Sequence, residues 1–211
     1  MGQPKQQRAV QTREAILRAA AAVFEESGYA GASINRILER AGATAGALYF
    51  HFKSKEGLAR AVMHAQPETI VPLADSVGVQ RVVDLTMVWA YQLRMDLMLR
   101  AGVRLTTEQT TIGMEDASGP YQEWAQILED CLRAGAERGE LQAGVDPREL
   151  AEYVVESCTG MQLYSAAVSG REDLSDRVVR MWRLLLPGVA VPSVVARTEV
   201  RAERVGAGAV V

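Results

Sequence analysis

Long hydrophobic runs are missing from this 211-residue chain, whose apolar stretches, such as Ala19–Phe24, are far too short to span a bilayer. The N-terminal residues MGQPKQQRAVQTRE become charged before an apolar segment forms, so we expect no signal peptide. Cysteine is scarce, and the apolar patterns around Cys131 and Cys158 predict buried free thiols in a reducing compartment. Together these absences predict a cytoplasmic protein without a membrane anchor.

The chain also lacks the common catalytic motifs. Its two histidines, His51 and His64, do not stand beside a candidate nucleophile. The sequence contains no phosphate-binding G-x-x-x-x-G-K-[S/T], no nucleophile-elbow G-x-S-x-G and no zinc-binding H-E-x-x-H. We therefore expect no enzyme activity, no cofactor and no metal ion.

Charge is unevenly distributed along the chain. The net charge is −3, yet residues 1–65 contain nine Lys and Arg against five Asp and Glu, and all three lysines lie within the first 55 residues. A basic N-terminal third on an acidic body is typical of a protein that binds a polyanion at one end. Chance asymmetry is the alternative, and the motifs must decide between the two.

Helical periodicity dominates the chain, and no segment alternates like a strand. Apolar residues recur at helical spacing from 13–27, which Thr12 begins and Gly28 ends, to the last helix, 173–186, which Pro187 and Gly188 close. Ser33, Thr44, Ser54 and Asp146 are expected to cap helices, and Pro67 and Pro72 are expected to end or kink the helix that Ser54 begins. A break is expected near Asp96, and the aperiodic stretch 106–119 is expected to form a long loop. The sequence thus predicts an all-α fold of about nine helices.

Residues 33–53 carry the functional information. Two short helices, Ser33–Ala41 and Thr44–His51, are separated by a Gly42-Ala43 turn, which is the spacing of a helix-turn-helix. Small residues at the start of the second helix allow its backbone to approach DNA, and its N-terminus favours phosphate. The predicted DNA-binding residues are Ser33, Asn35, Arg36, Thr44, Ala45, Gly46, Tyr49, His51, Lys53 and Lys55.

Two stretches resemble a known family. A-I-L-R-A-A-A-x-V-F-x-x-x-G-Y over 15–29 and A-G-A-T-A-G-A-L-Y-F-H-F-K-S-K-E-G-L over 41–58 resemble the TetR family of transcriptional repressors. Further along, C-T-G-M-Q over 158–162 and Y-Q-E-W over 121–124 are similar to the γ-butyrolactone receptors of streptomycete-type bacteria. So are G-R-E-D-L over 170–174, M-W over 181–182 and L-L-P-G over 185–188.

The resemblance implies a repressor that binds a palindromic operator as a homodimer and releases it when a small lipophilic γ-butyrolactone hormone binds. It implies a helix-turn-helix DNA-binding domain over 8–54, a connecting helix over 55–77, a helical ligand-binding and dimerisation domain over 78–190 and a disordered tail over 191–211. The alternative is a TetR-type regulator of another hydrophobic ligand, such as a butenolide, a furan or a drug. Ala45 departs from the Lys common in these receptors, which puts the family's operator preference in doubt.

A ligand site in such a domain is expected to be apolar with a few polar groups. The resemblance favours Trp124 as a pocket wall, with simple core packing as the alternative. Thr159 interrupts an apolar helix, where its hydroxyl either binds a lactone carbonyl or bonds back to its own helix. The predicted ligand-binding residues are Gln66, Trp89, Tyr121, Trp124, Leu128, Thr159 and Gln162. The last two long helices, 147–168 and 173–186, are predicted to form the dimer face.

Overall fold

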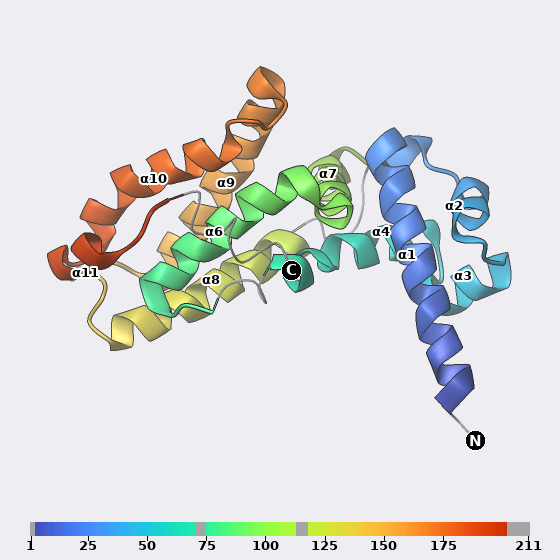
Figure 1. Ribbon diagram of the computed structural model, residues 1–211, viewed down its shortest axis with the longest axis horizontal. Helices are drawn as coiled ribbons and strands as arrows, with labels where there is room; N and C mark the ends of the chain where they lie inside the picture. Colours follow the sequence, from blue (N-terminus) through green and yellow to red (C-terminus); the bar gives the residue numbers. More distant parts are fainter. Residues whose placement is uncertain (1–2, 71–74, 113–117, 202–211) are drawn as a thin grey trace. The chain divides into compact units, whose positions relative to one another are not determined.

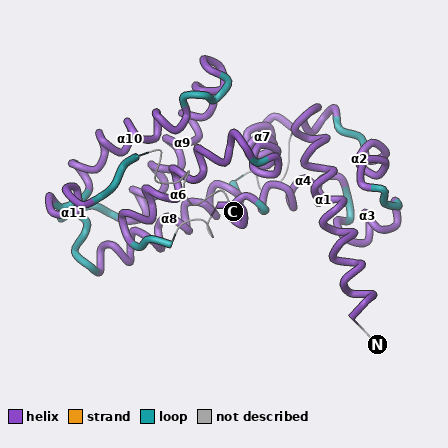
Figure 2. Tube along the Cα trace, in the orientation of Figure 1, coloured by secondary structure: helices purple, strands orange, loops and turns teal. Residues whose placement is uncertain are grey.

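The computed structural model describes residues 3–70, 75–112 and 118–201, and these residues form eleven helices and no strand (Figures 1 and 2). The prediction of an all-α fold is confirmed. The two short helices α5 (Gln66–Ile70) and α11 (Pro192–Arg197) were not expected, because each is too short to show a periodic pattern. The others are α1 (Gln3–Gly31), α2 (Ile34–Ala41), α3 (Ala45–Phe52), α4 (Lys55–His64), α6 (Gly78–Met95), α7 (Leu97–Ile112), α8 (Gly119–Glu137), α9 (Pro147–Ser169) and α10 (Leu174–Val189).

The chain divides into two compact units. The first comprises Met1–Pro67 with Asp96–Pro120, and the second comprises Glu68–Met95 with Tyr121–Val211. Helix α7 therefore belongs with the N-terminal helices, where it packs on α1 and α4. The sequence had assigned the whole of 78–190 to one domain, because loop lengths alone do not indicate which helices pack together.

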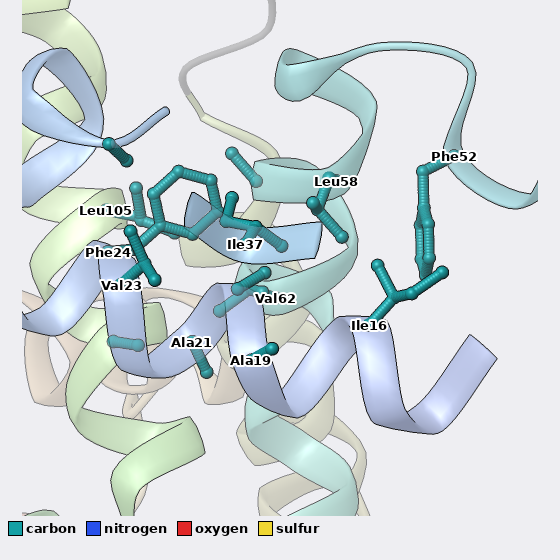
Figure 3. Close-up of a cluster of buried hydrophobic side chains, with 14 of the residues drawn as sticks. Ile16, Ala19, Ala21, Val23, Phe24, Ile37, Phe52, Leu58, Val62 and Leu105 are labelled. Atoms are coloured by element: carbon teal, nitrogen blue, oxygen red, sulfur yellow. The ribbon is translucent and has the colours of Figure 1, made fainter. Parts of the chain in front are cut away.

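The core of the first unit is built from the inward faces of α1, α2, α3, α4 and α7. Phe24 from α1 and Ile37 from α2 are completely buried in it, together with Leu58 from α4 and Leu105 from α7 (Figure 3). Each such side chain contributes about 1.5–3 kcal/mol to stability by leaving water. This burial fixes the two short helices of the predicted helix-turn-helix against α1.

Hydroxyl caps begin three successive helices of this unit, as the sequence predicted. Ser33 accepts a hydrogen bond from the Arg36 N–H at 3.2 Å, and Thr44 accepts one from the Ala47 N–H at 3.3 Å. Ser54 accepts from the N–H of Gly57 at 2.9 Å. Gly42 ends α2 in the left-handed conformation (φ 60°), which produces the turn before α3.

The start of α1 differs from the prediction. The helix begins at Gln3 rather than after Thr12, because the intervening residues contain no glycine and Pro4 lies in the first turn, where proline is compatible with a helix. Gly28, the predicted end, interrupts regular helical geometry with φ 66° and ψ 179°, but helical residues continue beyond this kink to Gly31.

The prediction of one continuous connecting helix over 55–77 was also wrong. It is interrupted at Ala65, so that α4 and α5 are separate helices, and residues 75–77 are not helical. Pro72, which was expected to end or kink this helix, lies outside the described residues.

The stretch 106–119 was predicted as a loop, but its first part is helical, because α7 extends as far as Ile112. Thr106 Oγ1 and Thr107 Oγ1 donate to the carbonyls of Gly102 and Val103 at 2.8 and 2.9 Å, so these polar side chains are satisfied within the helix. Residues 113–117 lie outside the described residues. The predicted break at Asp96 is confirmed, and its carboxylate accepts from the Leu99 N–H at 2.7 Å.

In the second unit, α6 packs on α10, and α10 packs on α9. Asp146 begins α9 as predicted, accepting from the backbone N–H groups of Arg148 and Glu149 at 2.7 and 3.2 Å. Helix α10 continues past Pro187 to Val189. The predicted disordered tail is wrong for Pro192–Arg197, which form α11 with Val194 buried, while 202–211 lie outside the described residues.

Candidate operator-binding surface and ligand residues

Helix α3 has one buried and one exposed face. Leu48 and Phe52 are buried in the first unit, whereas Ala45, Gly46 and Tyr49 are exposed. Thr44, whose hydroxyl caps the helix, is exposed as well. The helix therefore presents its N-terminal turn and one phenol to solvent, as a recognition helix must in order to enter a major groove.

Phe50 is a surface residue that the sequence reasoning missed. Its side chain is 71% exposed, although phenylalanine is usually buried. Its ring lies 5.0 Å from the half-buried His51 ring in an edge-to-face arrangement. The signal was available, because the inward positions of Leu48 and Phe52 leave position 50 on the outer face of a helix.

Lys53 ends α3 in an unusual backbone conformation. Its φ is 67° and its ψ is −39°, and the Ser54 N–H donates to the Phe52 carbonyl at 2.8 Å, which closes a γ-turn. The ammonium of Lys53 donates to the Phe50 carbonyl at 3.0 Å and lies 5.7 Å from the Phe50 ring centroid. The turn thus keeps this cation at the C-terminal end of the recognition helix.

Lys55 and Arg36 have partners within the protein. The Lys55 ammonium lies 4.4 Å from the Tyr29 ring centroid, and burial lowers the pKa of this lysine. Arg36 donates to Ser27 Oγ at 2.7 Å and pairs with Glu26. Glu26 also accepts from Arg40 at 2.6 Å, and this hydrogen bond is the main cause that lowers the pKa of Glu26. DNA contacts by Lys55 and Arg36 would require rearrangement of these pairs. Ser33 and Asn35, by contrast, are exposed at the start of α2.

Three of the predicted ligand residues share one face of α8. Tyr121, Trp124 and Leu128 lie three and four residues apart, and Leu128 is buried while both aromatic side chains are half-buried. Trp89 is half-buried on α6. The partial exposure of Trp124 leaves part of its indole available for contact.

The polar candidates on α9 differ in their hydrogen bonding. Thr159 Oγ1 donates to the Val155 carbonyl at 2.8 Å, so the back-bonded alternative holds for its hydroxyl. Gln162 is only 2% exposed, and its Oε1 has no hydrogen-bond partner among the described residues. An unpaired buried acceptor is costly, and this cost favours a role in binding a polar ligand group.

Gln66 belongs to the first unit, whereas the other ligand candidates belong to the second. Its Nε2 donates to Thr106 Oγ1 at 3.0 Å, and its side chain packs against Gly102, where an added Cβ would lie 2.7 Å from Gln66 Cγ. This contact joins α5 to α7. The structure therefore shows Gln66 in contact with α7, and its role in ligand binding stays a prediction.

A hollow of about 470 Å³ lies elsewhere in the second unit. It contains none of the predicted ligand residues, and its carboxylate, Glu140, is paired with Arg138 and Arg197. Its lining consists of Ser76, Val77, Gln80, Arg138, Glu140, Val194, Arg197 and Thr198.

Both cysteines are free thiols, as predicted; Cys158 is buried and Cys131 half-buried. Burial raises the pKa of Cys158 to about 12, so this thiol stays protonated and unreactive at neutral pH. In the described part of the chain, no helix combines the length and apolar character needed to cross a membrane.

Comparison with known proteins assigns both halves of the chain. Residues 16–62 match the bacterial regulatory proteins of the tetR family, and residues 78–192 match the tetracyclin repressor-like C-terminal domain. The chain belongs to the TetR family. It is therefore a TetR-type transcriptional repressor with an operator-binding helix-turn-helix and not an enzyme.

Individual proteins with known names or structures are also similar to this TetR regulator. The A-factor receptor protein of Streptomyces griseus is 44% identical over 192 residues, which cover 91% of this chain and 68% of the receptor. The crystal structure of the TetR regulator TylP from Streptomyces fradiae aligns with a TM-score of 0.86 at 40% identity, covering 97% of this chain and 91% of TylP. A γ-butyrolactone receptor described as ArpA-like aligns with a TM-score of 0.68 at 29% identity, covering 95% of this chain and 98% of the receptor.

Proposed function

We propose that this TetR regulator is a homodimeric repressor in the bacterial cytoplasm that releases its operator when a γ-butyrolactone binds the second unit. The similarity to the A-factor receptor carries the proposal, because it extends over 91% of the chain and so includes the helices outside the DNA-binding unit.

The proposed DNA contact places α3 in the major groove. Its exposed small residues, Ala45 and Gly46, let the backbone approach base edges, and the hydroxyl of Tyr49 donates to phosphate. Lys53 at the end of the helix supplies a cation to the same strand. With alanine in place of a long charged side chain, position 45 offers a methyl group suited to a thymine methyl.

The proposed dimer interface lies on α9 and α10. These helices expose apolar side chains that a monomer would leave in water, including Leu184, which is 83% exposed. The others are Tyr153, Leu163, Tyr164 and Val168. A two-fold operator requires a two-fold protein, and two copies of α9 and α10 form a four-helix bundle that buries this surface.

The proposed ligand residues are those on α6, α8 and α9. The half-buried indole of Trp124 supplies apolar contact area for a lipophilic chain. Gln162 carries both a donor and an unused acceptor on one buried amide, which suits a small ligand with a carbonyl and a hydroxyl group.

The test is a release experiment on an operator selected by the protein itself from random DNA. Fluorescence anisotropy follows a labelled operator while a γ-butyrolactone is added, and the matched control is the same compound with its lactone ring hydrolysed. We expect release by the lactone alone. Equal release by both forms, or release only by an unrelated hydrophobic compound, contradicts the lactone proposal.

The dimer is tested separately by light scattering at micromolar concentration. We expect twice the 22.9 kDa mass of one chain. Substitution of the exposed Leu184, as Leu184→Glu, is expected to shift the protein towards monomer. A monomeric wild type contradicts the proposed interface.

A further inference from the structure

The first ten residues of α1 form a helical extension outside the core of the first unit. The helix begins at Gln3, whereas its first fully buried residue is Ile16. At about 1.5 Å per residue, Gln3–Thr12 adds about 15 Å of helix to the part that packs. Figure 1 shows this N-terminal part of α1 continuing beyond the helices it packs against.

The extension joins the packed part of α1 beside the end of the recognition helix. The guanidinium of Arg13 lies 5.4 Å from the centroid of the Phe52 ring, the last residue of α3. Figure 3 shows Ile16 of α1 next to the same ring, and both residues belong to the core of the first unit. Any DNA that receives α3 in its groove therefore passes close to the extension of α1.

The charge of the extension is of one sign. The extension contains Lys5 and Arg8 and no acidic residue; Arg13 follows it, and the first acidic residue of the chain is Glu14. Arg8 is exposed and forms no ion pair with any described residue, whereas Arg18, further along the same helix, pairs with Glu14 at 3.7 Å. Around Arg8, the exposed side chains at Gln6, Gln7 and Gln11 are further hydrogen-bond donors.

We propose that the extension of α1 is a second DNA contact, in which Arg8 binds the sugar–phosphate backbone outside the bases that α3 reads. The major groove is about 12 Å wide, so a phosphate strand borders the groove on each side of the recognition helix. A helix that continues past the end of α3 meets that strand as it leaves the groove. The inference rests on the proposed placement of α3 and adds a contact to the flanks of the operator.

The test compares two lengths of the selected operator. One carries about ten additional base pairs on each side, and the other is trimmed to the bases that α3 protects. Arg8→Ala is expected to weaken binding to the long operator roughly fivefold and to leave the trimmed operator unaffected. On the long operator, the slope of the logarithm of the binding constant against the logarithm of the salt concentration should become shallower by about 0.9 for each copy of Arg8 lost.

Arg18→Ala is the matched control, because it removes the same charge from an exposed, paired position of the same helix. We expect wild-type affinity for Arg18→Ala on both lengths, and near wild-type affinity for Arg8→Lys, which restores the cation. Circular dichroism verifies that all variants fold.

Three results separate the possibilities. Equal affinities of Arg8→Ala and Arg18→Ala for the long operator overturn the proposed contact. An equal loss on both operator lengths overturns its position on the flanks. A wild-type protein that selects no operator sequence contradicts the placement of α3 itself, independently of Arg8.

Discussion

The indole Nε1 of Trp182 donates a hydrogen bond to the hydroxyl of Thr86 at 2.7 Å, deep inside the second unit. Trp182 is completely buried on α10, and Thr86 is buried on α6. The Thr86 hydroxyl donates in turn to the Val83 carbonyl at 2.8 Å, so donor and acceptor are both satisfied. The M-W pair that resembled the receptors therefore has a structural role at Trp182, which fastens α10 to α6.

Removal of the Thr86 hydroxyl is expected to destabilise the protein. Thr86→Val leaves the Trp182 N–H buried without an acceptor, at a cost of about 1–3 kcal/mol. Thr86→Ser keeps the hydroxyl and serves as the control. Urea unfolding followed by circular dichroism measures both, and a Thr86→Val variant as stable as Thr86→Ser contradicts the importance of this bond.

Gly57 is expected to tolerate no side chain. A Cβ at this position would lie 2.1 Å from the carbonyl oxygen of Phe52, a backbone atom at the junction of α3 and α4. Gly57→Ala must therefore displace the end of the recognition helix, and we expect a loss of about 1–3 kcal/mol in stability together with weaker operator binding. Thermal unfolding and anisotropy measure the two effects.

Gly46→Ala is the counterpart of this substitution, because an added Cβ meets only Thr44 Oγ1, at 3.9 Å. Alanine favours the helix by about 1 kcal/mol over glycine, so stability is expected to rise or stay constant. Operator affinity should nevertheless fall, because the added methyl group keeps the start of α3 away from the bases. Unchanged affinity contradicts close approach of the backbone at Gly46.

Local signals in the sequence predicted the helix-turn-helix well. The hydroxyl caps at Ser33 and Thr44 and the glycine turn at Gly42 depend on residues three or four positions apart, so a sequence shows them directly. Only the last part of α7, residues 106–112, was missed, because threonine back-bonds there support the helix without producing apolar periodicity.

Contacts between distant residues were outside the reach of such signals. Lys55 lies over Tyr29, and Gln66 bonds to Thr106, which is forty residues away. Neither contact can be recognised from the sequence, because the two partners are far apart along the chain; the predicted binding roles of Lys55 and Gln66 stay predictions. The exposed position of Phe50, by contrast, followed from the helical register and was overlooked.

Acid is expected to weaken the junction of α9 and α10 through Asp173. Its carboxylate accepts hydrogen bonds from Arg177 at 2.5 Å and from Ser165 and Ser169 at 2.6 and 2.7 Å. These bonds, of which the one from Arg177 has the largest effect, hold the pKa of Asp173 well below its usual range. Because folding lowers this pKa, the ionised carboxylate stabilises the protein at pH values above the unfolded-state pKa of about 3.9. This stabilisation is lost as the pH falls below that value towards the pKa of the folded state.

Asp173→Asn removes this dependence. At pH 7 we expect the variant to be less stable than the wild type, and the difference should shrink as the pH falls from about 4 to 2. Denaturant midpoints at a series of pH values measure the effect. A difference that stays constant over this interval contradicts the assignment to Asp173.

Tyr49 and Lys53 are expected to bind phosphate rather than bases. Tyr49→Phe and Lys53→Ala should each weaken binding to selected and to random DNA by a similar amount, roughly 1–2 kcal/mol of binding free energy. Lys53→Ala should also lower the salt dependence by about one unit for each copy lost, which Tyr49→Phe should not. Anisotropy titrations at several salt concentrations distinguish the two, and a loss confined to the selected sequence indicates base contacts instead.

Trp124 is expected to be required for release and dispensable for DNA binding. Its half-buried indole lies on α8 in the second unit, whereas the recognition helix belongs to the first. Trp124→Ala removes apolar ligand contacts, so release should need at least about tenfold more γ-butyrolactone, equivalent to about 1.4 kcal/mol. Affinity for the operator in the absence of ligand should remain close to that of the wild type.

Trp124→Phe separates ligand contact from packing, because it keeps an aromatic ring of smaller area on the same face of α8. We expect its release to be intermediate between those of the wild type and Trp124→Ala. Ligand and DNA affinities are coupled reciprocally, so the lactone should also bind the operator complex more weakly than the free protein. If Trp124→Ala is folded by circular dichroism but has lost operator binding, the indole is a packing residue of α8, which is the alternative that the sequence left open.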